Sequence, residues 1–398
     1  MNKRWISVIV PTVFAGSLLA GCGVVSAQAG TAGSSKQAMG NTTHTSMSNT
    51  AGGMSNGANS MGNTSGMTGN AVGSMGSSKG LMKGTVSAGM PLRIGDLLVG
   101  PSASPMMGSG SGGFFIDNIR KAMVTNVSLA TGANSLQAAI TGHTAYVPTL
   151  QGETFVVNLN TRMVTDHFMT PQNARIASIA DGGKLLLITG ASSVTAYSLP
   201  SHTMKWQVKQ GGNTLAVAGG VAYLSGNGAA DTVIINLKTG QQMGTIPAGQ
   251  IENSVYDAQR HTLWLANWTT GDMTVVNTKD NKVVATIHET EGGGFSPSNM
   301  MGSTGGFMQL AVGPRGKTVY AASFSGNIMA YNAVTNMFAK NIPVGSGSKL
   351  SGLAIDPSGS YAYVTVENKQ ETVAVSLSTG KVVSTMHGVE ANRWAVID

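Results

Sequence analysis

Cysteine is almost absent from this chain: Cys22 is the only one among 398 residues. A single cysteine excludes a disulfide within the chain and a CxxCH haem attachment. Charged residues are also scarce, at 10% of the sequence, where about a quarter is usual. The 17 acidic residues leave little material for paired catalytic carboxylates, and the sequence contains neither a GxSxG nucleophile elbow nor a Walker loop. The sequence therefore gives weak support to an enzyme.

The scarcity of charge means that serine, threonine, asparagine, glutamine and glycine must build the surface. Such a composition is common in exported proteins. It would equally suit a surface facing acid or high metal, where carboxylates would titrate or chelate. The formal net charge is +7, but no basic run is interleaved with aromatic residues, so we expect no nucleic-acid partner.

The N-terminus has the features of a lipoprotein signal peptide. Lys3 and Arg4 precede an apolar stretch, Ile6 to Ala20, which is short for a membrane span and typical of a signal peptide. The stretch ends in Leu-Ala-Gly-Cys22, which resembles the bacterial lipobox. We predict residues 1–21 to be a signal peptide and Cys22 to be lipidated. The protein would then be extracytoplasmic, anchored to the outer membrane or to the outer leaflet of the cytoplasmic membrane. The alternative is an ordinary signal peptide with a chance cysteine.

Residues 22–113 are predicted to be a disordered tether rich in Met, Gly, Ser and Asn. Such a segment cannot bury enough apolar surface to offset its ordering entropy. Thioether sulfurs select Cu(I) and His44 adds an imidazole, so copper binding is one interpretation. A low-complexity linker that tolerates methionine is the other. The methionines recur every six to eight residues, at Met39, Met47, Met54, Met61, Met67, Met75, Met82 and Met90.

Two C-terminal stretches repeat each other and predict the fold. They begin at Leu310 and Leu353, and each contains a short apolar run, a Gly-centred turn, a Tyr/Val run, an alternating run and a last β-branched run. Four strands in about 40 residues are the signature of a β-propeller blade. Weaker copies upstream bring the complete units to six, and the two chain ends supply strands for one more. We therefore predict an all-β, seven-bladed β-propeller of four-stranded blades over residues 114–398.

Two details refine this prediction. The last residues, Asn392–Asp398, match the first strand of a unit such as Ala174–Asp181. Together with residues 114–132 they would form a blade shared between the N- and C-terminal strands, which closes the ring. The third strands of the units, such as Thr232–Asn236, alternate apolar and polar residues, and this pattern predicts strands with one buried face.

The runs Tyr320-Ala-Ala-Ser and Tyr363-Val-Thr-Val, each followed by an alternating strand and a Thr-(Asn/Gly) turn, resemble the YVTN-type β-propeller repeat family. The resemblance covers about residues 138–398. It implies an extracytoplasmic or surface propeller and no specific activity, because the family is defined by its scaffold. Similar propellers occur in lactonases and in electron-transfer enzymes, whose cofactor motifs this chain lacks.

Ligands of propellers usually bind at the mouth of the central channel, where fourth strands connect to the next first strands. His288 and Glu289 follow one predicted fourth strand, and His387 and Glu390 follow another at the matching place. Two imidazoles with carboxylates suit copper or zinc, so His288 and His387 are candidate metal ligands. Solvated loop residues copied by repeat duplication are the alternative.

Three further residues are candidates for ligand binding. Arg175 and Arg393 begin two first strands and could together accept an anion at the channel mouth. Trp268 begins a second-to-third-strand loop, where it could stack on a sugar or a partner side chain. The connection 292–306 is longer than its counterparts, and long loops are often functional.

These observations favour a lipid-anchored, extracytoplasmic propeller that binds a protein, polymer or other envelope component. The first alternative is a copper-type metal-handling or redox-accessory lipoprotein that uses the Met-rich tether and the channel-mouth His and Glu residues. The second is a lactonase-like hydrolase with its site at the channel mouth.

Overall fold

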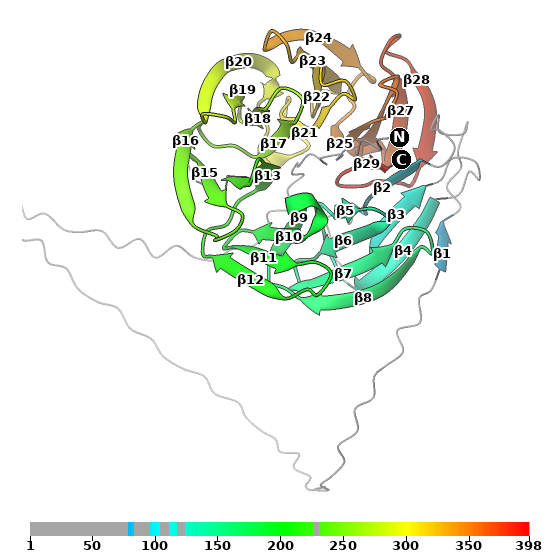
Figure 1. Ribbon diagram of the computed structural model, residues 1–398. Helices are drawn as coiled ribbons and strands as arrows, with labels where there is room; N and C mark the ends of the chain where they lie inside the picture. The colour runs from blue at the N-terminus through cyan, green and yellow to red at the C-terminus, as the bar shows by residue number, and fades with distance from the viewer. Residues whose placement is uncertain are drawn as a thin grey trace, which may run out of the picture. The chain divides into compact units, whose positions relative to one another are not determined.

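The computed structural model describes residues 79–82, 96–103, 111–117, 124–131, 133–226 and 231–397. These residues form antiparallel sheets that surround a common centre, which is a β-propeller (Figure 1). Six of the sheets have four strands and one has five. No helix in the described ranges has the length and hydropathy to cross a membrane.

Each four-stranded sheet uses four consecutive strands, and in every case the first strand is nearest the centre of the ring (Figure 1). In chain order the strands are β5 (Ala139–Thr141), β6 (Thr144–Pro148), β7 (Glu153–Asn158) and β8 (Met163–Met169); β9 (Ala174–Ala180), β10 (Leu185–Gly190), β11 (Val194–Ser198) and β12 (Met204–Val208); β13 (Thr214–Ala218), β14 (Val221–Ser225), β15 (Asp231–Asn236) and β16 (Gln242–Pro247); β17 (Asn253–Asp257), β18 (Thr262–Ala266), β19 (Thr270–Asn277) and β20 (Lys282–Gly293); β21 (Phe307–Val312), β22 (Thr318–Ser323), β23 (Asn327–Asn332) and β24 (Met337–Pro343); β25 (Leu350–Ile355), β26 (Tyr361–Val366), β27 (Glu371–Ser376) and β28 (Val382–His387). Three short 3-10 helices are η2 (Asp181–Gly183), η3 (Pro297–Asn299) and η4 (Glu367–Lys369).

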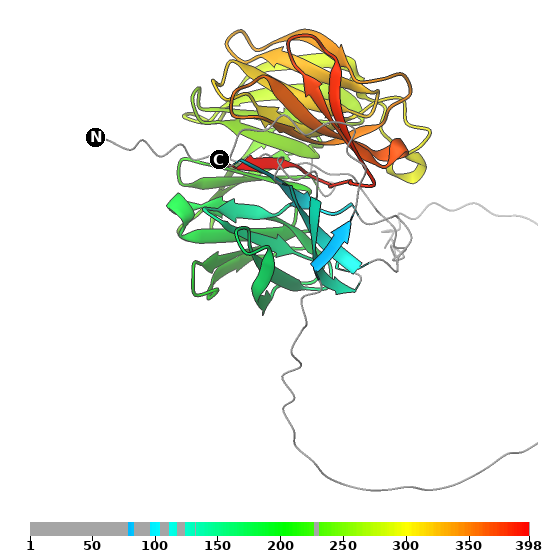
Figure 2. The same ribbon diagram turned by 90° about the vertical axis from the view of Figure 1, so that its right-hand side faces the viewer.

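The remaining sheet has five strands and joins the two ends of the described chain. Its order is β1 (Lys79–Met82), β4 (Val124–Thr131), β3 (Ser111–Asp117), β2 (Leu97–Pro101) and β29 (Ala395–Ile397). Figure 2 shows β29 in red beside β2, with which it pairs from Leu97↔Ile397 to Val99↔Ala395. The prediction of seven four-stranded blades is therefore wrong in its count, because the structure has six.

The predicted start of the propeller at residue 114 is also too late. Strands β1 and β2 and the beginning of β3 precede it, and Leu98 and Val99 are completely buried. The run Leu97-Leu98-Val99 has the apolar character of a strand, but it is short and lies next to the Gly/Met-rich segment. The predicted lipidation site Cys22 and almost all of the predicted Met-rich tether lie outside the described residues.

The third strands are buried on both faces, and the prediction of one buried face is wrong. The polar members of the alternating pattern are threonines that enter the packed layer and find hydrogen-bond partners there. Thr232 Oγ1 lies 2.7 Å from Ser225 Oγ, and Thr372 Oγ1 donates to the carbonyl of Val389 at 2.7 Å. Both threonines are fully buried. A hydroxyl can be buried at low cost when it is hydrogen-bonded, so alternation does not identify a solvent-facing side here.

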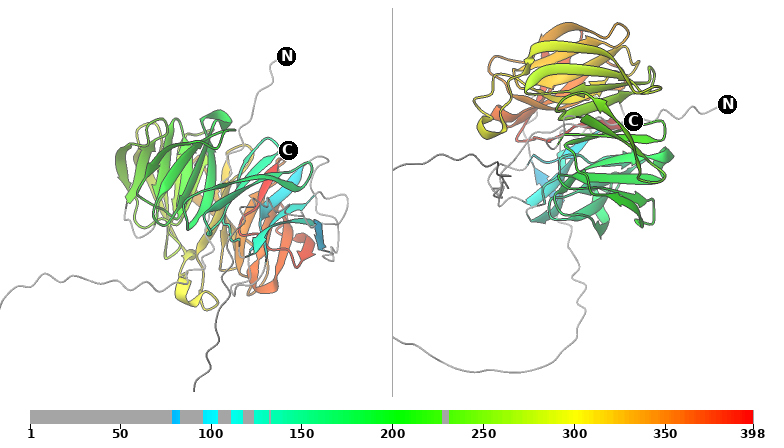
Figure 3. Two further views of the ribbon diagram at one scale, coloured as in Figure 1. Left: turned by 90° about the horizontal axis from the view of Figure 1, so that it is seen from below. Right: turned by 90° about the vertical axis from the view of Figure 1, so that its left-hand side faces the viewer.

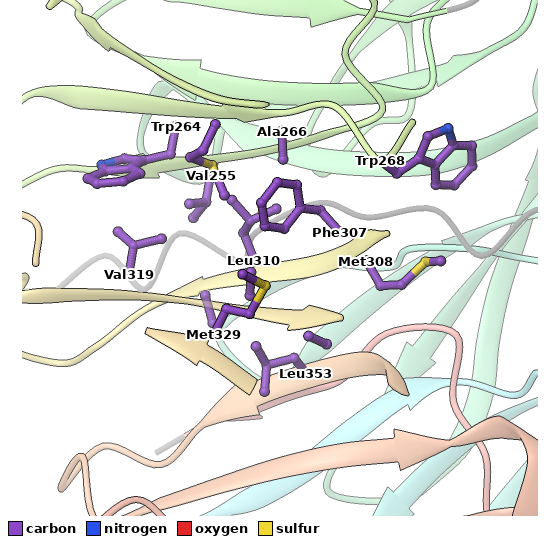
Figure 4. Close-up of a cluster of buried hydrophobic side chains, with 14 of the residues drawn as sticks. Val255, Trp264, Ala266, Trp268, Phe307, Met308, Leu310, Val319, Met329 and Leu353 are labelled. Atoms are coloured by element: carbon purple, nitrogen blue, oxygen red, sulfur yellow. The ribbon is translucent and has the colours of Figure 1, made fainter. Parts of the chain in front are cut away.

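Apolar side chains from neighbouring sheets interlock to form the core. Figure 4 shows one such layer, in which Trp264 of β18, Phe307 and Leu310 of β21 and Leu353 of β25 point toward one another. All four are completely buried. Burying one large apolar side chain stabilises a fold by about 1.5–3 kcal/mol, so this packing holds each sheet against the next.

The predicted long connection 292–306 lies at the end of β20, the longest strand, and extends away from the sheets (yellow in Figure 3, left). Two contacts hold this segment against the rest of the fold. Phe295 is buried against Trp268, with ring centroids 4.5 Å apart, and Lys349 Nζ donates to the carbonyl of Ser303 at 2.6 Å. The segment is therefore a packed part of the fold.

Candidate functional site

A cavity of about 1390 Å³ lies at the centre of the ring and is hereafter the central cavity. Its walls come from the inner strands β5, β9, β13, β17 and β29. They carry mainly small and branched apolar side chains, such as Ala138, Leu215, Val255 and Val396. The space suits a ligand with an apolar body, because such pockets are mostly apolar with a few placed polar groups.

The mouth of the central cavity is formed by the turns that follow β5, β9 and β13. Gly219 and Gly220 make the third of these turns with φ of 53° and 88°, a backbone that glycine adopts without strain. Side chains with ionisable groups gather at this end, and they are His143, Asp181, Lys205 and Lys238. The entrance is therefore polar and the interior apolar.

Gln137 lies on the wall of the central cavity and connects it to a buried arginine. The Gln137 Nε2 donates to the carbonyl of Ala177 at 2.9 Å, and its Oε1 accepts a hydrogen bond from Arg393 Nη1 at 2.9 Å. Gln137 also borders a second cavity of about 10 Å³, which is lined by Arg393 and Trp394. One side chain therefore separates the guanidinium from the larger space.

Arg393 is 2% exposed, yet among the described residues only Nη1 of its guanidinium has a hydrogen-bond acceptor. Its Nε and Nη2 have no hydrogen-bond partner in the part of the chain that the structure describes. Nor does any described carboxylate form an ion pair with it. The adjoining cavity is near the lower limit for a single water. A buried guanidinium in this state has unmet demand for an anionic acceptor.

A second buried arginine, Arg175, adds positive charge beside Arg393. Arg175, at the start of β9, is 8% exposed, and its carbonyl accepts from the backbone N–H groups of Leu136 and Gln137, each at 3.0 Å. Burial lowers the pKa of Arg175 to about 10. Burial, and then the charge of Arg175, lower the pKa of Arg393. At neutral pH a guanidinium keeps its proton, so the two positive charges oppose each other within the core.

The sequence-based prediction of an arginine pair at the starts of two first strands thus identified two neighbouring residues. Their burial was not predicted, and neither was Gln137, which mediates between the arginine and the cavity. The signal for Gln137 was weak: a single polar residue in the apolar run Leu136–Ile140.

Glu390 was expected beside His387 at the channel mouth, but its neighbour is another glutamate. It lies close to Glu367 of η4, and burial followed by the charge of Glu367 raises the pKa of Glu390 to about 7. Burial also raises the pKa of Glu367 to about 7, against the effect of the nearby Ser351 hydroxyl, which lowers it. Glu289 is on β20, where burial and the charge of Glu291 raise its pKa. These glutamates do not form one rim with the arginines.

The two candidate metal ligands lie on separate sheets. His288 is on β20 and its Nδ1 is 2.9 Å from Asp272 Oδ1, while His387 is on β28 and its Nδ1 is 3.1 Å from Glu371 Oε2. Each histidine faces an acid on the adjacent third strand of its own sheet. No group of three His, Cys, Asp or Glu side chains suitable for a metal occurs in the described ranges. The prediction that the histidines converge at the channel mouth is wrong, because the fourth strands are the outermost ones.

Trp268 is 4% exposed and packs within the core against Phe295. It therefore has no free ring face for a sugar or a partner, contrary to the prediction. The signal that could have indicated this is Phe295 itself, an aromatic residue within the long connection that returns over the tryptophan.

No family model and no curated protein sequence matches this chain. Among solved structures, hydrazine synthase from Kuenenia stuttgartiensis is similar over 61% of this chain and 77% of its own, with 14% identity and a TM-score of 0.52. Dihydro-heme d1 dehydrogenase NirN in complex with DHE is similar over 75% of each chain, with 12% identity and a TM-score of 0.51. At these identities the likeness extends to the fold alone.

Proposed function

We propose that this chain is a binding protein of the cell envelope that holds an organic anion with an apolar body in its central cavity. The observation that carries the proposal is Arg393, a buried guanidinium with two unpaired nitrogens, one side chain away from a large apolar space. A carboxylate that replaced Gln137 Oε1 as the acceptor would pair with Arg393, and the apolar part of the ligand would cover the cavity wall. Charge-assisted hydrogen bonds of this kind are about twice as strong as neutral ones.

The location in the envelope is part of the same proposal. It is supported by the lipobox-like sequence that ends at Cys22 and by the apolar stretch before it. Membership of the YVTN-type repeat family would agree with this location. It is supported by Tyr320 and Tyr363, which occupy the same third position of the second strands β22 and β26.

Thermal unfolding of the full chain with octanoate and with octanol tests the proposed ligand class. The two probes share an apolar chain and differ in charge. We expect octanoate to raise the melting temperature in a saturable way and octanol to have little effect. Arg393→Gln should abolish the octanoate response, and Arg315→Gln, at an exposed turn, should keep it.

Arg393→Gln could lose the octanoate response simply because it does not fold, so a second variant is needed. Gln137→Glu places a carboxylate in the position that the ligand would take, so it should fold and yet lose the response to octanoate. Equal responses to octanoate and octanol, or an unchanged octanoate response in folded Arg393→Gln, would refute the proposal.

The metal-handling alternative rests on the methionines between Met39 and Met90, nearly all of which lie outside the described residues. Titration of Cu(I) into the full chain, in competition with a chelator of known affinity, tests it. Stoichiometric binding that is lost when these methionines are replaced with leucine would support a copper function.

A further inference from the structure

Apolar side chains are exposed at the same place in all six four-stranded sheets. In each sheet, the turn from the third to the fourth strand contains one residue with positive φ, namely Arg162, His202, Gly240, Asn281, Asn336 and Gly380. Within three residues after it, each chain segment presents one or two large apolar side chains that are 37–62% exposed. They are Met163, Met204, Met243, Val283 and Val284, Met337, and Val382 and Val383, hereafter the apolar rim.

The turns that carry the apolar rim are built alike, so the exposure is a repeated feature. In four of them an asparagine side chain at the end of the third strand accepts backbone N–H groups of the turn; in the second such turn Asn236 Oδ1 accepts from Lys238 at 2.9 Å and from Thr239 at 3.1 Å. Asn158, Asn277 and Asn332 do the same in their turns. The scaffold thus fixes the apolar residue next to the turn, where any polar residue would fit equally well.

The six turns lie at one end of the propeller. The sheets repeat one strand order outward from the centre, and the start of β5 and that of β9 are joined by a parallel bridge, Gln137↔Ile176. Third-to-fourth turns therefore fall at the same end of every sheet, on the outer strands that Figure 1 labels β8, β12, β16, β20, β24 and β28. All six turns therefore face the same side of the ring.

Positive charge accompanies the apolar rim. The turns and the three residues that follow them contain one acid, Asp280, which lies 3.8 Å from Lys282, and a second acid beside them, Asp166, lies 3.4 Å from His202. The same segments contain six basic residues, and these are Arg162, Lys205, Lys238, Lys279, Lys282 and Lys381. The rim is thus both apolar and cationic in a chain that has few charges overall.

We propose that the apolar rim lies on an anionic lipid surface. Basic residues beside apolar side chains are the composition of interfacial membrane-binding segments, in which anionic headgroups attract the cations and the apolar groups enter the acyl boundary. A protein partner needs a compact patch of about 800 Å². The rim instead places one or two residues per sheet around a circle, which suits a flat sheet of lipid. Lys205 and Lys238 of these segments also line the mouth of the central cavity, but the inference rests on the rim and needs no ligand in the cavity.

Vesicle co-sedimentation tests the proposal. The full chain carries Cys22→Ser in every sample, so that no acyl chain contributes. The vesicles are phosphatidylcholine with or without phosphatidylglycerol. We expect binding to the anionic vesicles that falls with added salt. Replacing Lys282 and Lys381 with glutamine should weaken it by about tenfold or more, and replacing Val283 and Val382 with serine should also weaken it.

A matched control removes the same charge from the other end of the propeller. Lys209 follows β12 and Lys369 lies in η4 between a second and a third strand, and both are exposed. The control variant Lys209→Gln, Lys369→Gln should bind like the parent. The rim and control variants have the same N-terminal residues, so these residues cannot cause a difference between them. Equal vesicle binding by rim and control variants would overturn the proposal. So would self-association in sedimentation velocity without lipid that only the rim variants lose, because the rim would then be a contact between copies of the chain.

Discussion

Arg393 donates a hydrogen bond from Nη1 to the side-chain oxygen of Gln137, 256 residues away in the sequence, at 2.9 Å. The pair joins the segment that leads into the last strand, β29, to the segment that leads into β5. It also leaves a cation in the core with a neutral acceptor. Because the neighbouring Arg175 adds a second positive charge, the contact is a source of instability that an anion would relieve.

Replacing Gln137 with glutamate should therefore stabilise the fold. The new carboxylate would give Arg393 a charged acceptor, worth about 1.5–3 kcal/mol for a hydrogen bond to a charged group. This gain outweighs the loss of the hydrogen bond from Gln137 Nε2 to the Ala177 carbonyl, worth about 0.5–1.5 kcal/mol. Gln137→Leu should do the opposite and lower the free energy of unfolding by a similar amount. Urea denaturation at neutral pH measures both. A glutamate variant less stable than the parent would show that Arg393 already has a counter-ion.

The stability of the fold should fall as the pH rises from about 4.5 to 8. Glu252 is completely buried, and burial raises its pKa to about 8, against a backbone hydrogen bond from Trp268 that lowers it. Between its unfolded and folded pKa values the folded protein binds the proton and the unfolded chain does not, so the free energy of unfolding decreases with pH. Glu367 and Glu390, with pKa values of about 7, act in the same direction.

Glu252→Gln should remove part of this pH dependence. The variant should match the parent at pH 5 and exceed it at pH 8, by on the order of a few kcal/mol. Thermal unfolding at the two pH values measures the difference, with the exposed Asp280→Asn as a control that should follow the parent. The idea fails if parent and Glu252→Gln differ equally at both pH values.

Gln309 should be critical for closing the ring. This fully buried side chain accepts from the backbone N–H groups of Leu353 at 2.7 Å and Trp394 at 3.1 Å, and donates to the Trp394 carbonyl at 3.1 Å. Gln309→Leu would remove all three contacts, at about 1–3 kcal/mol for each buried group left unpaired. We expect a large loss of stability, measured by urea denaturation. Gln242→Leu, at an exposed position, should change little.

Loss of His288 and His387 should leave the metal content unchanged. Each imidazole pairs with a carboxylate across one sheet, and exposed pairs of this kind contribute about 0–1 kcal/mol. Elemental analysis of the full chain and of the double variant His288→Ala, His387→Ala compares their copper and zinc. A loss of either metal in the double variant would restore the metal interpretation of these residues.

The repeat pattern predicted the propeller because turns and strands recur locally. Tyr320 and Tyr363 lie in the predicted second strands. The last residues join a sheet with N-terminal strands as expected, but they pair with β2, which precedes the predicted residues 114–132. The repeat pattern gave a wrong prediction where packing between sheets determines whether a side chain is buried. The alternating pattern predicts that Thr232 faces solvent, but in the structure it is fully buried and its hydroxyl pairs with Ser225 on the adjacent strand of the same sheet.

In the candidate site, too, the repeats predict some residues and only the folded ring shows the others. Arg175 and Arg393 could be predicted as a pair because each lies at the start of a first strand, and equivalent positions of repeats occupy equivalent positions in the fold. Nothing in the sequence around Arg393 shows that its partner is Gln137, because the contact exists only after the ring has closed. The same holds for Trp268, whose burial depends on Phe295 in a distant connection.

The pairing of β29 with β2 has a consequence for how the fold forms. The ring is completed by residues 392–397, which follow all six four-stranded sheets in the sequence. Until they pair, the inner edge of β2 is open and can pair with another chain. We expect a variant that lacks residues 392–397 to aggregate, because every copy would then expose this edge.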